Sequence, residues 1–237
     1  MSTFSADIFI GVLQRGPTSR WGFADIRGMH PLAEEYPSAV SLAVAYRYEK
    51  TEYDYAHFEQ VLSRSRRQME GVVQAADDYL RSTDVHYFVV PVGGQDPDTL
   101  LGVFPHKLAA TRAGLGWIGK SSLLVTPEFG PRVRLQTILF AAELPANDPI
   151  TESHCGECEA CVQACTYGYI HNTLWRPGVN REALFSPFDC SRKREEFIPT
   201  LGHKHPCGYC LLACPIGNIN SLPPALTDGK TLLSDLQ

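Results

Sequence analysis

All eight cysteines of this 237-residue chain lie in one stretch, between Cys155 and Cys214. They form two groups with the spacing of iron–sulfur ligands. The first group has the pattern C-x2-C-x2-C-x3-C, the second has C-x2-C-x3-C-P, and one cysteine stands between them; the set is Cys155, Cys158, Cys161, Cys165, Cys190, Cys207, Cys210 and Cys214. Each [4Fe–4S] cluster is held by four thiolates. The number of cysteines therefore matches two clusters.

The order of the cysteines predicts how they divide between the clusters. In the bacterial two-cluster ferredoxin pattern, the fourth cysteine of each run binds the other cluster. Applied to this chain, one cluster is predicted to be held by Cys155, Cys158, Cys161 and Cys214. The other is predicted to be held by Cys165, Cys190, Cys207 and Cys210, with Cys190 in place of the first cysteine of the second run.

Zinc sites and disulfides are the two alternative uses of these cysteines. Structural zinc is the main alternative, because pairs of cysteines two residues apart also bind Zn²⁺. Zinc does not require the run of four cysteines, however, and disulfides would require an oxidising compartment that nothing in the sequence indicates. One departure from the cluster pattern is that Thr166 follows Cys165, whereas Pro215 follows Cys214. The missing proline removes no ligand.

The composition is that of an ordinary globular protein. Hydrophobic residues make up 44% and charged residues 20%, and the net charge of −5 gives no basic surface for general nucleic-acid binding. A local run of basic residues predicts either surface charge or an anion site: Lys107, Arg112, Lys120, Arg132 and Arg134. The N-terminus lacks the features of a signal peptide, and no stretch approaches the ~18 apolar residues of a membrane helix. We expect a cytoplasmic protein that does not bind membranes.

The elements that position the cysteines are predicted from periodicity. Because the cysteines begin after a Pro- and Asp-containing seam, we expect one domain at 1–148 and a cluster domain at 149–237. Apolar spacing in the first domain predicts strands and helices in alternation. The predicted strands are 39–46, 85–92, 123–125 and 133–142, the last two joined by a turn at 127–131, and the predicted helices are 56–82 and 105–113. This alternation predicts an α/β or α+β fold.

A glycine-rich loop runs from Gly114 to Ser121 and matches the phosphate-binding string G-x4-G-K-[ST]. That motif works only between a preceding strand and a following helix. Here a helix precedes the loop and a strand follows it, so we do not expect nucleotide hydrolysis. Glycines permit close backbone approach, which either a cofactor or a tight turn could require.

The run from Arg112 to Ser121, the Thr126–Gly130 segment and the double-cluster cysteines together resemble the epoxyqueuosine reductase family. That family comprises cobalamin-dependent iron–sulfur enzymes of tRNA queuosine biosynthesis, related to the reductive dehalogenases. The resemblance covers most of the chain. It implies a nitroreductase-like cobalamin-binding domain followed by a ferredoxin-like double [4Fe–4S] domain. We expect a small-molecule substrate and a low-potential electron donor such as a ferredoxin or flavodoxin.

The resemblance also implies site residues. Cobalamin contacts are expected near Leu124, Leu135 and, less directly, Ser191. Independently of the resemblance, Trp117 lies inside the glycine loop and is placed to face a cofactor, and Lys120 with Arg112 could meet the phosphate of a flavin.

Two departures from the family pattern bear on function. The position of the family's catalytic Asp is occupied by Leu100, so Asp98 and His106 are the candidate proton donors. The relatives continue beyond the second cluster into helical repeats that engage tRNA, whereas this chain stops soon after Pro215. We therefore expect a short relative for which a tRNA substrate is doubtful.

Three functions remain open from the sequence. The favoured one is a cobalamin-dependent reductase. The alternatives are an electron-transfer protein without a catalytic site of its own and a reductase that uses flavin in the same scaffold. The size of the first domain argues against a simple carrier, because the segment from Cys155 to Cys214 would suffice for one.

Overall fold

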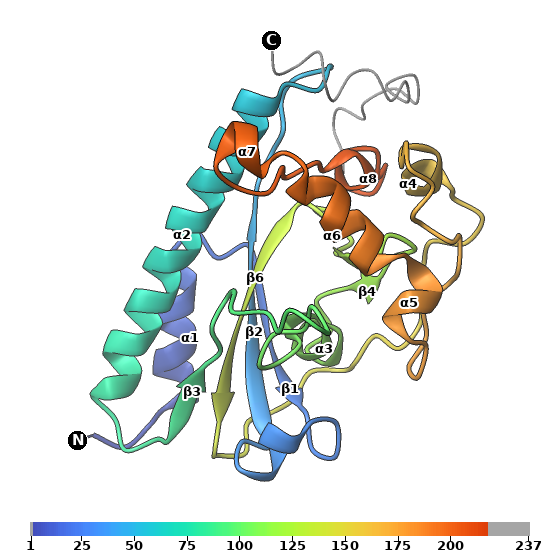
Figure 1. Ribbon diagram of the computed structural model, residues 1–237. Coiled ribbons are helices and arrows are strands. Elements are labelled where there is room, and N and C mark those ends of the chain that lie inside the picture. The colour runs from blue at the N-terminus through green and yellow to red at the C-terminus, as the bar shows by residue number, and fades with distance from the viewer. Residues whose placement is uncertain (1, 218–237) are drawn as a thin grey trace. The chain divides into compact units, whose positions relative to one another are not determined.

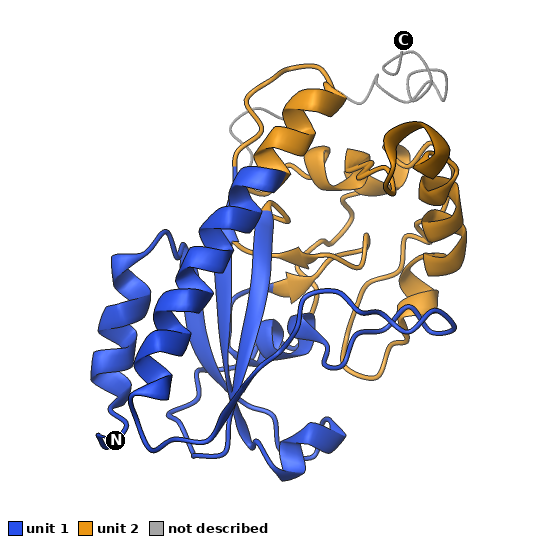
Figure 2. Ribbon diagram, turned by 60° about the vertical axis from the view of Figure 1, so that its left-hand side comes forward, with its two compact units in different colours: residues 1–46, 63–116, 133–151 blue, residues 47–62, 117–132, 152–237 orange. Residues whose placement is uncertain are grey.

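The computed structural model describes residues 2–217, which form two compact units (Figure 2). Within the described residues, unit 1 comprises 2–46, 63–116 and 133–151, and unit 2 comprises 47–62, 117–132 and 152–217. The final passage from unit 1 to unit 2, at 151–152, lies close to the predicted seam. Two earlier segments, 47–62 and 117–132, also belong to unit 2 and contain no cysteine.

Unit 1 is built on a four-stranded antiparallel sheet in the order β1-β2-β6-β3 (Figure 1). The strands are β1 (Arg20–Asp25), β2 (Ser38–Ala45), β6 (Val133–Phe140) and β3 (Tyr87–Val89). In the centre of the sheet, Leu42 of β2 lies opposite Gln136 of β6. The predicted mixed α/β fold is confirmed.

Two helices, α1 (Ala6–Arg15) and α2 (Tyr55–Arg81), supply the side chains that cover one face of this sheet. The helix α1 begins at Ser5, whose hydroxyl accepts a hydrogen bond from the Ile8 amide, as an N-cap residue should. The shared core contains apolar side chains from both helices and three strands: Phe9, Leu13, Phe23, Val40, Leu42, Val44, Met69, Val72, Ala76, Leu80, Ile138 and Phe140. Alternate β2 residues point to this face.

The helix α3 (His106–Arg112) packs against β1, β2 and β6. The residues of β2 that alternate with its core-facing set are small and fully buried: Ala39, Ser41 and Ala43. Small residues also face them from α3, where Ala109 and Ala110 are 0% exposed. A Cβ atom added at Gly22 would lie 2.5 Å from the Ala113 carbonyl oxygen. Small side chains on both elements thus allow a close approach.

Unit 2 contains a two-stranded sheet and several short helices. The strands are β4 (Trp117–Ile118) and β5 (Leu124–Val125), which pair antiparallel. The helices are α4 (Ala160–Gln163), α5 (Arg181–Leu184), α6 (Pro187–Glu195), α7 (Ile198–Leu201) and α8 (Tyr209–Leu212). A second core of mainly aromatic side chains includes two residues of α8: Tyr48, Tyr53, Phe58, Phe197, Tyr209 and Leu212. The described helices include none with both the length and the apolar character needed to cross a membrane.

Most predicted elements are present, with three differences. The predicted strand 85–92 is confined to Tyr87–Val89. The predicted strands at 123–125 and 133–142 lie in different sheets, and the turn between them is closed by a bridge between Thr126 and Gly130. The elements α1, β1 and β4 were not predicted, and a 3-10 helix, η1 (Pro31–Glu34), adds to unit 1.

The close packing of α3 on the sheet can be tested by replacing Gly22 with alanine. Because the added methyl meets a backbone carbonyl, we expect Gly22→Ala to lower the free energy of unfolding by about 1–3 kcal/mol. Gly11→Ala is the matched control, since nothing lies within 4 Å of its Cβ position in α1. Gly11→Ala should raise the free energy of unfolding by about 0.5–1 kcal/mol, because alanine is favoured over glycine within a helix. Urea titration measures both, and equal effects of the two changes would show that the packing is loose.

Candidate functional site

All eight cysteines belong to unit 2, and none forms a disulfide. The short helices position several of them. Cys161 lies in α4, Cys190 in α6 and Cys210 in α8. Cys207 and Gly208, just before α8, both have positive φ angles, and a Cβ on Gly208 would clash with the Phe58 ring. The chain bends sharply here to present Cys207.

The structure brings the first predicted set of cysteines together. Burial, together with charges on Cys155, Cys214 and Cys158, raises the pKa of the Cys161 thiol to about 12. Burial likewise raises the pKa of Cys214, with contributions in the same direction from Cys155 and Cys158. Cys214 is therefore an electrostatic neighbour of the first run, although it lies at the end of the second.

The second predicted set is also brought together. Burial raises the pKa of Cys207, and Cys190 and Cys165 add to the rise. Burial raises the pKa of Cys210 strongly, with additions from Cys207, Cys161, Cys165 and Cys190. The contribution from Cys161 shows that the two sets adjoin.

These thiols suit metal binding chemically. Burial and mutual repulsion favour the neutral form, so the thiols ionise together only if a cation replaces their protons, as bound metal does. Within residues 2–217, no three His, Cys, Asp or Glu side chains converge on a single metal-ion position. A cubane instead offers each thiolate its own iron. The donor type, the number of cysteines and their division into two sets of four fit two [4Fe–4S] clusters, and ligation itself stays a prediction.

The glycine loop forms a tight turn against the first set. The Gly119 amide donates to the Leu123 carbonyl and the Ser122 amide donates to the Gly119 carbonyl, both at 2.8 Å. A Cβ on Gly119 would lie 2.8 Å from Val125 Cγ2 and 3.5 Å from Cys155 Sγ. The glycine thus lets the loop approach the Val125 side chain, at a place next to Cys155. The tight turn is confirmed, and a cofactor contact remains a prediction.

Three of the predicted cofactor residues lie in or beside this loop. The Trp117 ring is buried and stacks on His154, with 4.7 Å between ring centroids and 28° between planes. Its Nε1 is buried without a hydrogen-bond partner in the part of the chain that the structure describes. Lys120 is only 4% exposed, so it does not form surface charge, and Leu124 in β5 is buried.

The other two predicted cofactor residues differ in their surroundings. Leu135 is half-buried in β6 of unit 1, opposite Ala43. Ser191 lies in α6 of unit 2, where its hydroxyl donates to Glu195 at 3.2 Å and accepts from Lys204 Nζ at 2.8 Å. The Ser191 hydroxyl is thus already engaged within unit 2.

The two candidate proton donors occupy different environments in unit 1. Asp98 is exposed, and its backbone amide donates to the Asp96 carboxylate at 3.0 Å. His106 begins α3 and is half-buried, with its Nδ1 2.9 Å from the Thr137 hydroxyl of β6. Burial lowers the pKa of His106, opposed by a hydrogen bond to the Pro91 backbone. His106 is therefore neutral at pH 7.

Two arginines beside the cysteines were not identified as functional from the sequence. Arg132, placed in the basic run, is buried rather than on the surface and donates to backbone carbonyls around Cys214. Arg194 in α6 donates to the His205 carbonyl at 2.6 Å. Nothing in the sequence indicated that these two arginines lie beside the cysteines, because only the fold brings each of them to a cysteine set.

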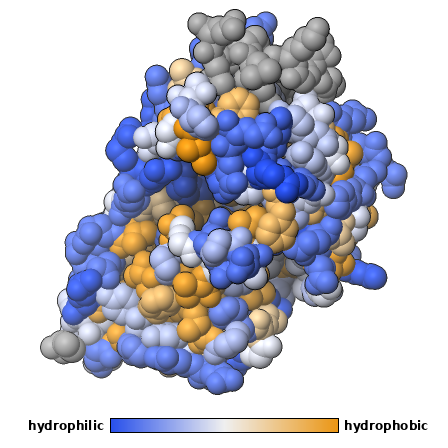
Figure 3. Space-filling view, viewed as in Figure 1, coloured by the Kyte–Doolittle hydropathy of each residue, from blue (hydrophilic) through white to orange (hydrophobic). Residues whose placement is uncertain are grey.

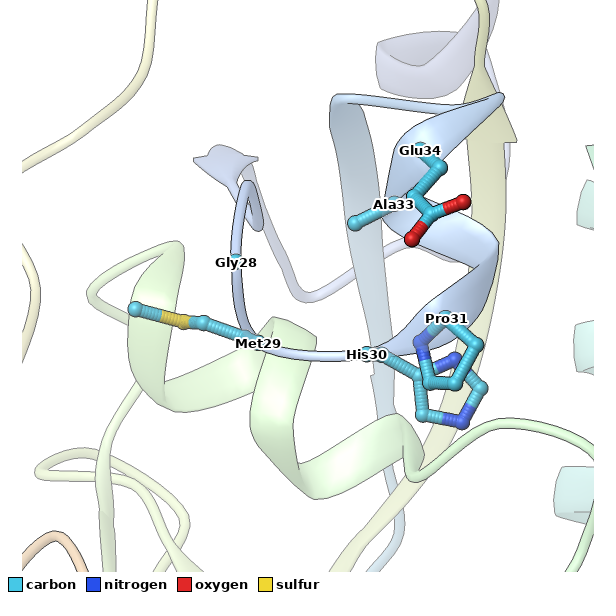
Figure 4. A pocket seen from close by; sticks show the side chains of 6 residues that line it. All are labelled: Gly28, Met29, His30, Pro31, Ala33 and Glu34. Carbon is cyan, nitrogen blue, oxygen red and sulfur yellow. The ribbon is translucent and has the colours of Figure 1, made fainter.

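Unit 1 carries an apolar surface and a small hollow outside the predicted site. Apolar side chains gather on the face of unit 1 seen in Figure 3. Exposed apolar residues of this unit include Met29, Val92, Leu101 and Val103. The hollow, shown in Figure 4, is lined by the segment around His30 and contains none of the predicted site residues.

Comparison with known sequences confirms the similarity to epoxyqueuosine reductases. The chain is 36% identical over 120 residues to epoxyqueuosine reductase from Gloeobacter violaceus, a match that covers 48% of this chain and 36% of the relative. It is 37% identical over 118 residues to the enzyme from Bacillus anthracis, covering 48% of this chain and 30% of the relative. The matches therefore span well under half of these relatives. No protein-family model matches the chain.

Solved structures share the fold. An epoxyqueuosine reductase aligns with a TM-score of 0.59 at 19% identity, covering 95% of this chain and 69% of that one. A catabolic reductive dehalogenase aligns with a TM-score of 0.65 at 15% identity. The alignment covers 98% of this chain and 37% of the dehalogenase. Another structure with this fold is a reductive dehalogenase whose structure suggests a mechanism for B12-dependent dehalogenation. It aligns with a TM-score of 0.62 at 15% identity, and the alignment covers 98% of this chain and 37% of the dehalogenase.

The interleaved cysteine sets can be tested with alanine variants of the anaerobically reconstituted protein. If Cys155 and Cys214 hold the same cluster, the double variant Cys155→Ala/Cys214→Ala should keep about four of about eight irons. The matched double variant Cys155→Ala/Cys207→Ala should lose nearly all iron, because it damages both sites. Iron analysis checks this. Loss of all iron from the first double variant would show that the sets are not interleaved.

The buried state of His106 predicts a pH effect on stability. Its pKa is lowered from the ordinary value of 6.5, so below 6.5 the unfolded chain binds a proton before the folded chain does. This contribution to stability is complete above pH 6.5 and is lost as the pH falls from 6.5 through the folded pKa. Thermal unfolding from pH 7.5 to 5 should show a smaller decline for His106→Gln than for the wild type. Identical slopes would contradict the assignment.

Proposed function

We propose that the protein is an iron–sulfur reductase that passes electrons through two [4Fe–4S] clusters to a bound cobalamin and reductively cleaves a small substrate. The observation that carries this proposal is the proximity of Cys214 to Cys155 and Cys158, and of Cys165 to Cys207, which the interleaved sets would require. The similarity to epoxyqueuosine reductases and the fold shared with a B12-dependent dehalogenase support the choice of a reductase.

The eight cysteines would supply the ligands of the clusters in the two sets described above. Because Cys210 of the second set interacts with Cys161 of the first, the two clusters would adjoin. Adjoining clusters permit one electron at a time to move between them. A low-potential ferredoxin or flavodoxin would donate that electron.

The cobalamin would be held by residues of the glycine loop and of β5 and β6, the strands that follow it in the sequence. The Trp117 indole N–H is a buried donor without a partner among the described residues, and an amide-bearing corrin could accept from it. Lys120 would meet the cofactor's phosphate, while Leu124 and Leu135 would contact its apolar parts. When bound, cobalamin supplies a cobalt centre that accepts electrons and carries out the bond cleavage.

Asp98 or His106 would deliver the proton that reductive cleavage requires. Burial lowers the pKa of His106, which makes its imidazolium a stronger acid and a less populated one at neutral pH. Asp98 is exposed and would have to move with its loop. The half-buried position of His106 against β6 makes it the more ordered candidate.

Two further proposals concern the substrate and the cellular location of the protein. One fold neighbour is an epoxyqueuosine reductase bound to a modified tRNA stem loop, with a TM-score of 0.57 at 19% identity. That neighbour weighs against our expectation that a tRNA substrate is doubtful, although the net charge of −5 offers no general attraction for nucleic acid. We keep a small molecule as the proposed substrate. A cytoplasmic location would keep the cluster thiols reduced.

Cofactor analysis after anaerobic reconstitution tests the proposal. We expect about one cobalamin per chain, bound with its base displaced from cobalt, as electron paramagnetic resonance would show. Trp117→Phe should weaken cobalamin binding by roughly tenfold, because it removes one buried donor while keeping the ring. Iron without any affinity for cobalamin would overturn the proposal and favour an electron-transfer protein. A bound yellow chromophore would favour a flavin reductase.

A further inference from the structure

A buried arginine holds the chain around the last cysteine of the first set. The Arg132 side chain lies within unit 2 and is only 4% exposed. Its Nη1 donates to the Leu211 carbonyl at 3.2 Å and the Cys214 carbonyl at 3.1 Å, and its Nη2 donates to the Ile216 carbonyl. The Arg132 guanidinium thus provides hydrogen-bond donors for carbonyl groups at and just beyond the end of α8, which have no donor within the helix.

Glycines allow the segment after Cys214 to lie against the turn that carries Arg132. Gly130 has a φ of +57°, and a Cβ added there would overlap the Ile216 carbonyl. Gly217, on the other side of the contact, has a φ of +63° and would overlap the backbone at Phe129. The approach of these two segments brings the guanidinium to Cys214.

A second arginine occupies a comparable place beside the second set. Arg194 Nε donates to the His205 carbonyl at 2.6 Å, and the Arg194 carbonyl accepts from the His205 amide at 3.1 Å. His205 is 1% exposed and stacks on Tyr55, with 5.0 Å between ring centroids and 29° between planes. Its Nδ1 accepts from the Cys207 amide at 2.8 Å. Arg194 is thereby connected to the backbone of Cys207.

Each arginine is placed at one predicted set of cysteines. Arg132 contacts the Cys214 carbonyl of the first set directly. Arg194 follows Cys190 by one helical turn in α6, and it reaches the Cys207 backbone of the second set through His205.

We propose that Arg132 and Arg194 are positioning residues, each of which raises the reduction potential of the one cluster it adjoins. The proposal rests on the two clusters of the proposed function. Reduction adds one electron and no atom to a cluster, so its negative charge increases. A nearby cation stabilises this reduced form more than the oxidised form, most strongly where water is excluded.

Charge-changing variants of the reconstituted protein test the proposal. Both clusters would be titrated with dithionite and followed by electron paramagnetic resonance, and the cysteine variants would assign the signals. Arg132→Gln should make the potential of the cluster held by Cys214 more negative and leave the other unchanged. Arg194→Gln should do the reverse. Arg132→Lys and Arg194→Lys, which keep the charge, should retain potentials close to the wild type.

Arg192→Gln is the matched control. It removes the same charge from α6, but Arg192 is exposed and pairs with Asp189, so both potentials should stay unchanged. Unchanged potentials in the Arg132 and Arg194 glutamine variants, or equal shifts in the lysine and glutamine variants, would overturn the proposal. If a glutamine variant does not take up iron, the lysine variant at the same position decides the test. A cluster potential in that lysine variant shifted from the wild-type value would then overturn the proposal. Failure of the wild type to bind iron would instead refute the proposed function.

Discussion

The crowding of the cysteine thiols, most of them half-buried, is the constraint on which unit 2 depends. Burial and the charges of neighbouring cysteines together raise the pKa of Cys161 to about 12, and they also raise the pKa of Cys207, Cys210 and Cys214. Such thiols cannot all ionise in an empty site, because each new negative charge would lie among others in a poorly solvated place. Bound iron would remove this conflict. Assembly of the clusters is therefore expected to release protons and to stabilise the fold.

The rest of unit 2 is arranged to hold these thiols. Four of its five described helices have only four residues, too few to be stable alone. The aromatic core around Phe58 includes residues of α8 and has Leu201 of α7 packed against it. Gly208 leaves room for the Phe58 ring beside Cys207, and Arg132 ties the end of α8 to the turn at 127–131. The cysteines thus sit on segments fixed by packing rather than by long helices.

The sequence predicted the parts of the molecule that depend on local pattern. Cysteine spacing indicated the two interleaved sets, and apolar periodicity indicated β2 and α2. Features that depend on packing between distant parts of the chain could not be predicted from the sequence. The separation of β5 and β6 into different sheets depends on partners far along the chain. The burial of Lys120 and Arg132 likewise follows from the fold, since neighbouring residues in the same basic run gave no indication of it.

The identity of the proton donor shows the same limit. His106 begins a predicted helix, and only the sheet order places it against Thr137 and thereby lowers its pKa. Nothing local to the sequence distinguishes it from a surface histidine.

Mössbauer spectroscopy of protein reconstituted with ⁵⁷Fe under anaerobic conditions tests the central claim most directly. The account predicts that essentially all iron, about eight atoms per chain, gives the signature of oxidised [4Fe–4S] clusters. A chain that holds only four irons in one cluster, or that binds zinc in place of iron, would contradict it.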